Sequence, residues 1–139
     1  MIIDYIKSKD EIITKDFEED LRVKLNSLGY EVTKTDEVFI AYVTDEKIEY
    51  IYNKINSVAI PAGLRYALIN EIVAEFLNTQ LLAGNIKDVD MDLAIRSIKE
   101  GDSDVTFQDS MSSEDKYKAL LENLRFKRGV FACYRKLKW

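Results

Sequence analysis

The sequence has 139 residues, 47% of them hydrophobic and 32% charged, and its formal net charge is −5, a composition that suits one domain with a substantial core. Histidine is absent and Cys133 is the one cysteine, which excludes histidine-based catalysis, a cysteine-rich zinc site and an internal disulfide. Because no glycine-rich phosphate loop, nucleophile motif or membrane-length apolar run is present either, we expect a protein that is not an enzyme, takes no cofactor and does not enter a membrane.

The first predicted helix covers residues 16–28. One proline and five glycines in the whole chain favour long helices over many turns. Within 16–28, apolar residues recur at helical spacing: Phe17, Leu21, Leu25 and Leu28. Gly29 follows as a stop signal. The preceding residues, Ile12 to Thr14, fit either a strand or the start of a helix.

A second helix is predicted from Asp36 to about Asn56, with Thr35 or Asp36 as its N-cap. Its apolar residues recur at steps of three and four: Val38, Ala41, Tyr42, Ile48, Ile51, Tyr52 and Ile55. The β-branched and aromatic residues from Val38 to Thr44 leave a strand open as an alternative. Thr44 and Asp45 also allow a break with a new cap.

The central core helix is predicted to start after Ile60-Pro61 and to run to about Ala83, before Gly84-Asn85. Its apolar side has a strict row of residues four apart: Leu64, Leu68, Ile72 and Phe76. We expect the opposite side, which carries Glu71 and Glu75, to be solvated.

Residues 94–108 predict a β-hairpin. Glu100-Gly101-Asp102 suit the turn, with Ile98 on one side and Val105 and Phe107 on the other. Such a hairpin has few apolar residues, so it either packs on the helices or extends towards a partner.

The last helix is predicted to start at Ser112 or Ser113, where Ser112 and Asp115 resemble a capping box. It is expected to end near Lys127 to Gly129, and its apolar face comprises Tyr117, Leu120, Leu121 and Leu124. The alternating residues after it predict an extended tail. The expected fold is therefore mainly α: one domain over 1–139, with a small helical bundle over about 16–128, a protruding β-hairpin over about 94–108 and an extended C-terminal tail over 129–139.

Charge is distributed unevenly along the chain. Residues 125–139 carry six basic side chains and no acidic one, whereas the remainder carries 14 basic and 25 acidic side chains, a net charge of −11. This asymmetry indicates a basic tail for an acidic partner or nucleic acid. The simpler alternative, that a basic terminus only complements an acidic body, stays open.

Several segments together resemble a known family. They are Ile60-Pro61-Ala62-Gly63-Leu64, the long helix with Glu71 and Glu75, the run Ser97-Ile98-Lys99-Glu100-Gly101-Asp102, Val105-Thr106-Phe107, and Leu120-Leu121 on to Arg128. Over roughly Asp36 to Arg128 the chain resembles the small head–tail connector proteins, also called head completion or adaptor proteins, of tailed bacteriophages and prophages. The first 35 residues lie outside this resemblance.

The resemblance implies a structural virion protein, made in the cytoplasm of the bacterial host and placed at the head–tail junction. Such proteins form rings of about a dozen copies below the portal protein and extend the channel for DNA. The implied partners are the portal protein, neighbouring copies and the next head-completion or tail-completion protein. DNA would pass through without specific binding, and acidic channel walls would favour its passage because cationic walls bind phosphates.

Partner contacts are expected from the hairpin and the tail. The candidates are Ile98, Asp102, Val105, Phe107, Tyr134, Arg135, Leu137 and Trp139. The aromatic and apolar tail residues would anchor in a partner's pocket with Arg135 beside them. The alternatives are that the tail folds back onto its own bundle and that Phe107 packs between hairpin and helices.

Two other functions are weighed against this one. A small DNA-binding regulator would contact phosphates through the basic tail, but no predicted helix has the basic recognition face that groove binding needs. An enzyme would use Glu71 and Glu75, which lie one turn apart as a metal-binding pair would. Without further ligands at a definable spacing, a solvated helix face explains that pair more simply.

Overall fold

A computed structural model describes residues 1–100 and 111–136, with the side chains of 98–100 excepted. The regular structure of these residues consists of 3-10 helices η1 (Ile2–Tyr5) and η2 (Ala62–Leu64) and of five α-helices, with no strand among them. The α-helices are α1 (Lys15–Ser27), α2 (Lys34–Ile55), α3 (Arg65–Leu82), α4 (Asp88–Glu100) and α5 (Ser113–Leu124). The expectation of a mainly α fold is confirmed.

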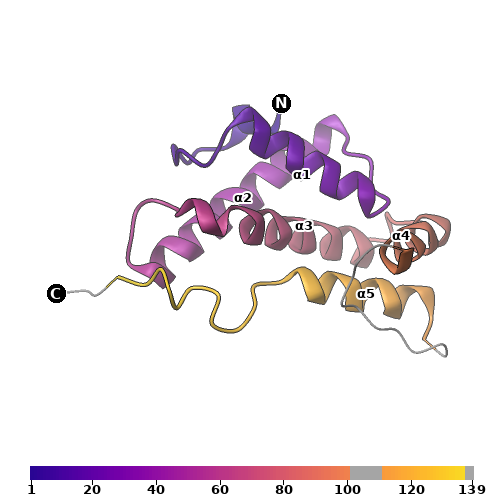
Figure 1. Ribbon diagram of the computed structural model, residues 1–139. Coiled ribbons are helices and arrows are strands. Elements are labelled where there is room, and N and C mark those ends of the chain that lie inside the picture. Colours follow the sequence, from indigo (N-terminus) through magenta and orange to yellow (C-terminus); the bar gives the residue numbers. More distant parts are fainter. Residues whose placement is uncertain (101–110, 137–139) are drawn as a thin grey trace.

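Helix α3 is the centre of the bundle. It packs against α1, α2 and α5, and Figure 1 shows it crossing the middle of the molecule with α1 above it and α5 below. Half of its residues are buried, and the predicted row Leu68, Ile72 and Phe76 is fully inaccessible to water. The burial of this row on one side of the helix explains its regular four-residue spacing in the sequence.

Local hydrogen bonds fix where the first two long helices begin. Thr14 caps α1, because its hydroxyl accepts the Phe17 N–H at 3.2 Å. Thr33 caps α2, and the Asp36 carboxylate accepts the Thr33 N–H at 2.9 Å in a reciprocal capping box. The predicted cap at Thr35 or Asp36 is therefore wrong by two or three residues, because Asp36 acts from the third helical position.

The ends of these helices need left-handed backbone. Gly29 follows α1 with φ of 83°, and a side chain there would also meet the carbonyl oxygen of Asp90 at 2.8 Å. Asn56 ends α2 with φ of 53° and ψ of 47°. Helix α2 is continuous between Lys34 and Ile55, so neither the alternative strand nor the alternative break occurs.

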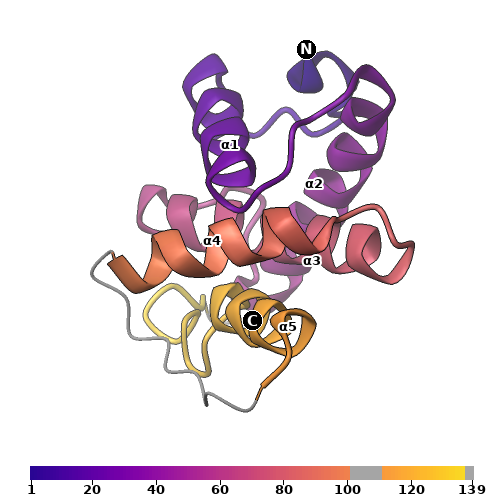
Figure 2. The ribbon, with the colours of Figure 1, turned by 90° about the vertical axis from the view of Figure 1, so that its right-hand side faces the viewer.

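The β-hairpin prediction is wrong for residues 94–100, which form the second half of α4. Met91, Ala94 and Ile95 are buried, and α4 packs on α5, as Figure 2 shows. The Ser113 hydroxyl donates a short hydrogen bond to the Asp92 carboxylate and joins the two helices near the start of α5. The other half of the predicted hairpin lies outside the described residues.

The chain after α5 also differs from the prediction. Helix α5 ends at Leu124 rather than near Lys127, because Arg125 adopts extended backbone. Residues 128–134 form turns closed by N–H to C=O bonds over three residues, so the extended-tail prediction is wrong for this part. Phe131 is 8% exposed, so the described part of the tail folds back onto the bundle. Every helix within 1–100 and 111–136 is too short or too polar to cross a lipid bilayer.

Candidate partner-binding surfaces

A buried carboxylate on α3 attaches the C-terminal segment to the bundle. Glu71 is 6% exposed and accepts hydrogen bonds from Arg125 Nη1 at 3.2 Å and from the Phe126 N–H at 3.0 Å. Lys47 Nζ lies 3.3 Å from the same carboxylate, and Glu75 accepts from Arg125 Nη1 at 2.7 Å. The expectation of a solvated face is therefore wrong for Glu71.

This network includes Glu71 and Glu75, the two carboxylates that would hold a metal ion if the protein were an enzyme. Arg125 contacts both Glu71 and Glu75, and Lys47 contacts Glu71, so two cations face two anions. Partial burial acts to lower the pKa of Arg125, but hydrogen bonds and charge from the two carboxylates outweigh it and raise that pKa above the ordinary value. No group of three or more potential metal ligands occurs in the described parts of the chain.

The segment after the turns is held by the end of α2. The Lys136 N–H donates to the Ile55 carbonyl at 2.8 Å, and the Asn56 side-chain amide donates to the Lys136 carbonyl at 2.8 Å. Tyr134 packs against the core beside Gly63, where an added methyl group would overlap its hydroxyl. The described part of the tail is thus fixed at both ends, at Arg125 and at Lys136.

A small basic pocket lies between this segment and α2. Its volume is about 330 Å³. Four cationic residues line it: Lys54, Lys127, Arg128 and Arg135. Three aromatic residues line it as well: Tyr50, Phe126 and Phe131. Its other lining residues are Gly129 and Ala132, so no carboxylate belongs to it. We call this site the basic pocket.

The aromatic residues of the basic pocket pack tightly on one another. The rings of Tyr50 and Phe126 are stacked, with centroids 5.8 Å apart, and Phe131 meets Phe126 edge-on at 4.9 Å. The Lys54 ammonium lies 5.4 Å from the centre of the Tyr50 ring. Because α2 supplies Tyr50 and Lys54 while the anchored segment supplies the rest, the pocket exists only when that segment is folded back.

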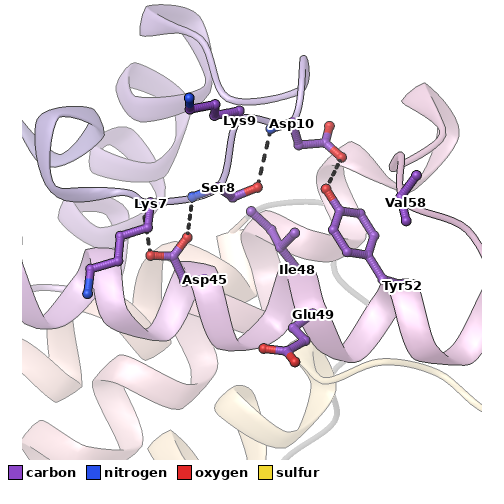
Figure 3. A pocket seen from close by; sticks show the side chains of 9 residues that line it. All are labelled: Lys7, Ser8, Lys9, Asp10, Asp45, Ile48, Glu49, Tyr52 and Val58. Carbon is purple, nitrogen blue, oxygen red and sulfur yellow. Dashed lines mark hydrogen bonds between the residues drawn. The ribbon is translucent and has the colours of Figure 1, made fainter.

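The other flank of α2 holds the N-terminal segment through carboxylates, as Figure 3 shows. The Asp45 carboxylate accepts the N–H groups of Lys7 and Ser8, both at 2.9 Å. Asp10 accepts the Tyr52 hydroxyl at 2.7 Å. Burial and this hydrogen bond raise the pKa of the Tyr52 hydroxyl above its ordinary value. These contacts use Asp45 and Asp10 to hold the fold.

Next to this segment, α2 presents an acidic surface with apolar side chains. It borders a hollow of about 390 Å³, which Tyr5 and the exposed Lys7 of the N-terminal segment also line. Val38 and Tyr42 lie one turn apart and are 54% and 65% exposed, respectively. Glu46 and Glu49 are also exposed, and Asp45 is half-buried. We call these five residues the α2 acidic face.

The structure describes three of the eight residues predicted to contact partners. Arg135 lines the basic pocket, and Tyr134 packs on the bundle. Ile98 belongs to α4 rather than to a strand. Five of the predicted residues lie outside the described part of the chain: Asp102, Val105, Phe107, Leu137 and Trp139.

Sequence reasoning missed most of the basic pocket. Tyr50 and Lys54 are one turn apart on α2, which was a visible signal, but nothing in the sequence joined them to residues some 75 positions later.

Comparison of the chain with protein-family models, with curated proteins and with solved structures found no match in any of the three.

Proposed function

We propose that this protein is a structural component of a tailed bacteriophage or prophage, which forms a ring between the portal and the tail and joins head to tail. The sequence resemblance over roughly Asp36 to Arg128 is the origin of this proposal. Residues 97–100 are helical rather than part of a strand, so the resemblance now rests mainly on the order of the helices.

One observation supports the proposal most: a small bundle carries two surface hollows of opposite charge. The basic pocket and the α2 acidic face differ in charge, and both include exposed aromatic side chains. A closed ring needs two different surfaces, because each copy uses one surface towards one neighbour and a second surface towards the other. Aromatic residues with a few charges are also typical of protein interfaces.

The charge of the chain fits a channel component. The net charge is −5, and three cations of the C-terminal segment, Lys127, Arg128 and Arg135, line one pocket, while Arg125 is paired with Glu71 and Glu75. A wall made of the acidic remainder would repel phosphates and let DNA move, whereas a cationic wall would bind them through counterion release.

Deletion of the gene in the phage or prophage that carries it tests the proposal. We expect electron microscopy of the lysate to show filled or leaking heads beside separate, complete tails. Restoring the gene on a plasmid should restore joined particles. Joined, infectious particles without the protein would refute the proposal.

The basic pocket also favours a second candidate, a nucleic-acid-binding regulator. Cations beside an exposed aromatic ring, here Tyr50, are typical of sites where single-stranded bases stack and phosphates pair. This candidate predicts salt-sensitive binding of single-stranded or duplex DNA by the purified protein, lost in Arg128→Glu. It also predicts normal joined particles in the deletion strain, so the same lysate distinguishes the two.

A further inference from the structure

We propose that the basic pocket of one copy binds the α2 acidic face of the next copy. This inference rests on the proposed ring and names the two surfaces that would build it.

The cations of the basic pocket are available for an external anion. Lys54, Lys127, Arg128 and Arg135 are all exposed. Among the described residues none of the four forms an ion pair, which is also true of exposed lysines elsewhere such as Lys9 and Lys15, and the Lys127 ammonium donates to two oxygens of Asn123. What distinguishes the four is that they line one pocket without a carboxylate. Four like charges around a cavity of about 330 Å³ repel one another, so a carboxylate-bearing partner stabilises them.

The α2 acidic face has the complementary character. Glu46 and Glu49 are exposed beside Val38 and Tyr42, so carboxylates and apolar area occur together. The basic pocket likewise combines cations with the half-exposed ring of Tyr50. Contact between the two surfaces would pair the charges and bury aromatic area at the same time.

A single copy cannot make this contact with itself. At roughly 100° per residue, Tyr50 and Lys54 lie about 80° and 120° around the axis of α2 from Tyr42. Glu46 lies one turn before Tyr50, so the two surfaces adjoin along α2, but two surfaces of one rigid helix cannot close onto each other. When two copies bind in this way, one copy keeps its basic pocket free and the other keeps its α2 acidic face free. Further copies can add at both ends, and such heterologous contacts can close into a ring.

The extent of the basic pocket favours a protein partner over nucleic acid. The neighbouring hollow, which Lys136 lines, is also lined by Glu49. Carboxylates thus begin where the pocket ends, and no basic track continues along α2 for a phosphate backbone to follow. A compact acidic surface needs no such track.

Disulfide trapping tests the contact. Cys133 is exposed and directly follows Ala132, which lines the basic pocket, and it is the one cysteine of the chain. The variant Glu46→Cys adds a second thiol on the α2 acidic face. In particles assembled by the phage, mild oxidation should then link copies into a ladder of dimers, trimers and larger species. Glu114→Cys on α5, equally exposed, is the matched control and should give no ladder beyond dimers.

Charge reversal provides a second test. Like charges set against each other cost several kcal/mol, so Arg128→Glu with Lys54→Glu, or Glu46→Lys with Glu49→Lys, should each lower the yield of joined particles at least about tenfold. Both pairs of changes in one chain should restore most of the yield. Unfolding curves of the purified variants check that each still folds.

The outcomes separate the contact from the proposed function. If the deletion strain makes unjoined heads but Glu46→Cys gives no ladder and the combined reversal restores nothing, the contact is refuted while the connector function stands. If a ladder forms but the deletion strain makes joined particles, the function is refuted and the contact stands. Salt-sensitive DNA binding that Arg128→Glu abolishes, without a ladder, would assign the pocket to nucleic acid and overturn the inference.

Discussion

The substitution Glu71→Gln probes the attachment of the C-terminal segment most directly. Glutamine keeps the volume and one acceptor oxygen, so the bond from the Phe126 N–H at 3.0 Å can persist. The negative charge opposite Arg125 and Lys47 is lost. Removing one partner of a buried ion pair costs about 3–5 kcal/mol. Since Arg125 and Lys47 are 24% and 14% exposed, water recovers part of that cost, and we expect a loss of about 2 kcal/mol.

Glu75→Gln is the matched control for this prediction. Glu75 contacts the same Arg125 nitrogen at 2.7 Å, but its side chain is 34% exposed. Its loss should cost about 1 kcal/mol or less, as for other solvent-exposed pairs. Urea unfolding followed by circular dichroism measures both values, and the slope of the curve should not change. Equal losses in the two variants, or a loss below about 0.5 kcal/mol for Glu71→Gln, would refute the role assigned to its burial.

Three further predictions concern other contacts. Gly63→Ala should destabilise the fold by about 1 kcal/mol, because the added methyl group displaces the hydroxyl end of the half-buried Tyr134 side chain, and adding Tyr134→Ala should cost less than the sum of the two single changes; an additive cost would contradict the overlap. Tyr117→Phe removes the hydroxyl that donates to the Leu28 carbonyl at 2.7 Å in the core, so urea unfolding should show a loss of about 1–3 kcal/mol. Burial and a carboxylate raise the pKa of Tyr30 to about 12, so its contribution to stability is complete below pH 10 and is lost as the pH rises towards 12; Tyr30→Phe should flatten this alkaline loss in unfolding curves taken at successive pH values.

The helical body was predictable because its residues interact locally. The row from Leu64 to Phe76 and the signals around Asp36 and Gly29 depend on residues three or four positions apart, and the structure places helices there. Helix α4 was missed although Met91, Ala94 and Ile95 have helical spacing and Asp88 and Asp90 stand in its first turn. The Glu-Gly-Asp sequence at 100–102 was interpreted as the turn of a hairpin and given more weight than that pattern. The same residue types also occur where helices end, so they do not distinguish the two structures.

The candidate surfaces depended on contacts across long distances in sequence. Glu71 was expected to be solvated because its neighbours on α3 are polar, and only the return of Arg125 and Phe126, 54 and 55 residues later, buries it. The basic composition after residue 125 was visible, but its meeting with Lys54 was not. A pattern within one helix identifies the side of the helix that is buried, and it contains no information on which distant segment covers the other side.

Two separate structural requirements meet at Asn56. Its left-handed backbone at the end of α2 favours glycine, whereas its bond to the Lys136 carbonyl requires a side-chain amide. Asn56→Gly would therefore gain in backbone conformation what it loses in attachment, with little net change in stability. In related sequences this position should vary together with the length and composition of the C-terminal segment: asparagine where that segment is kept, and glycine where it has been lost.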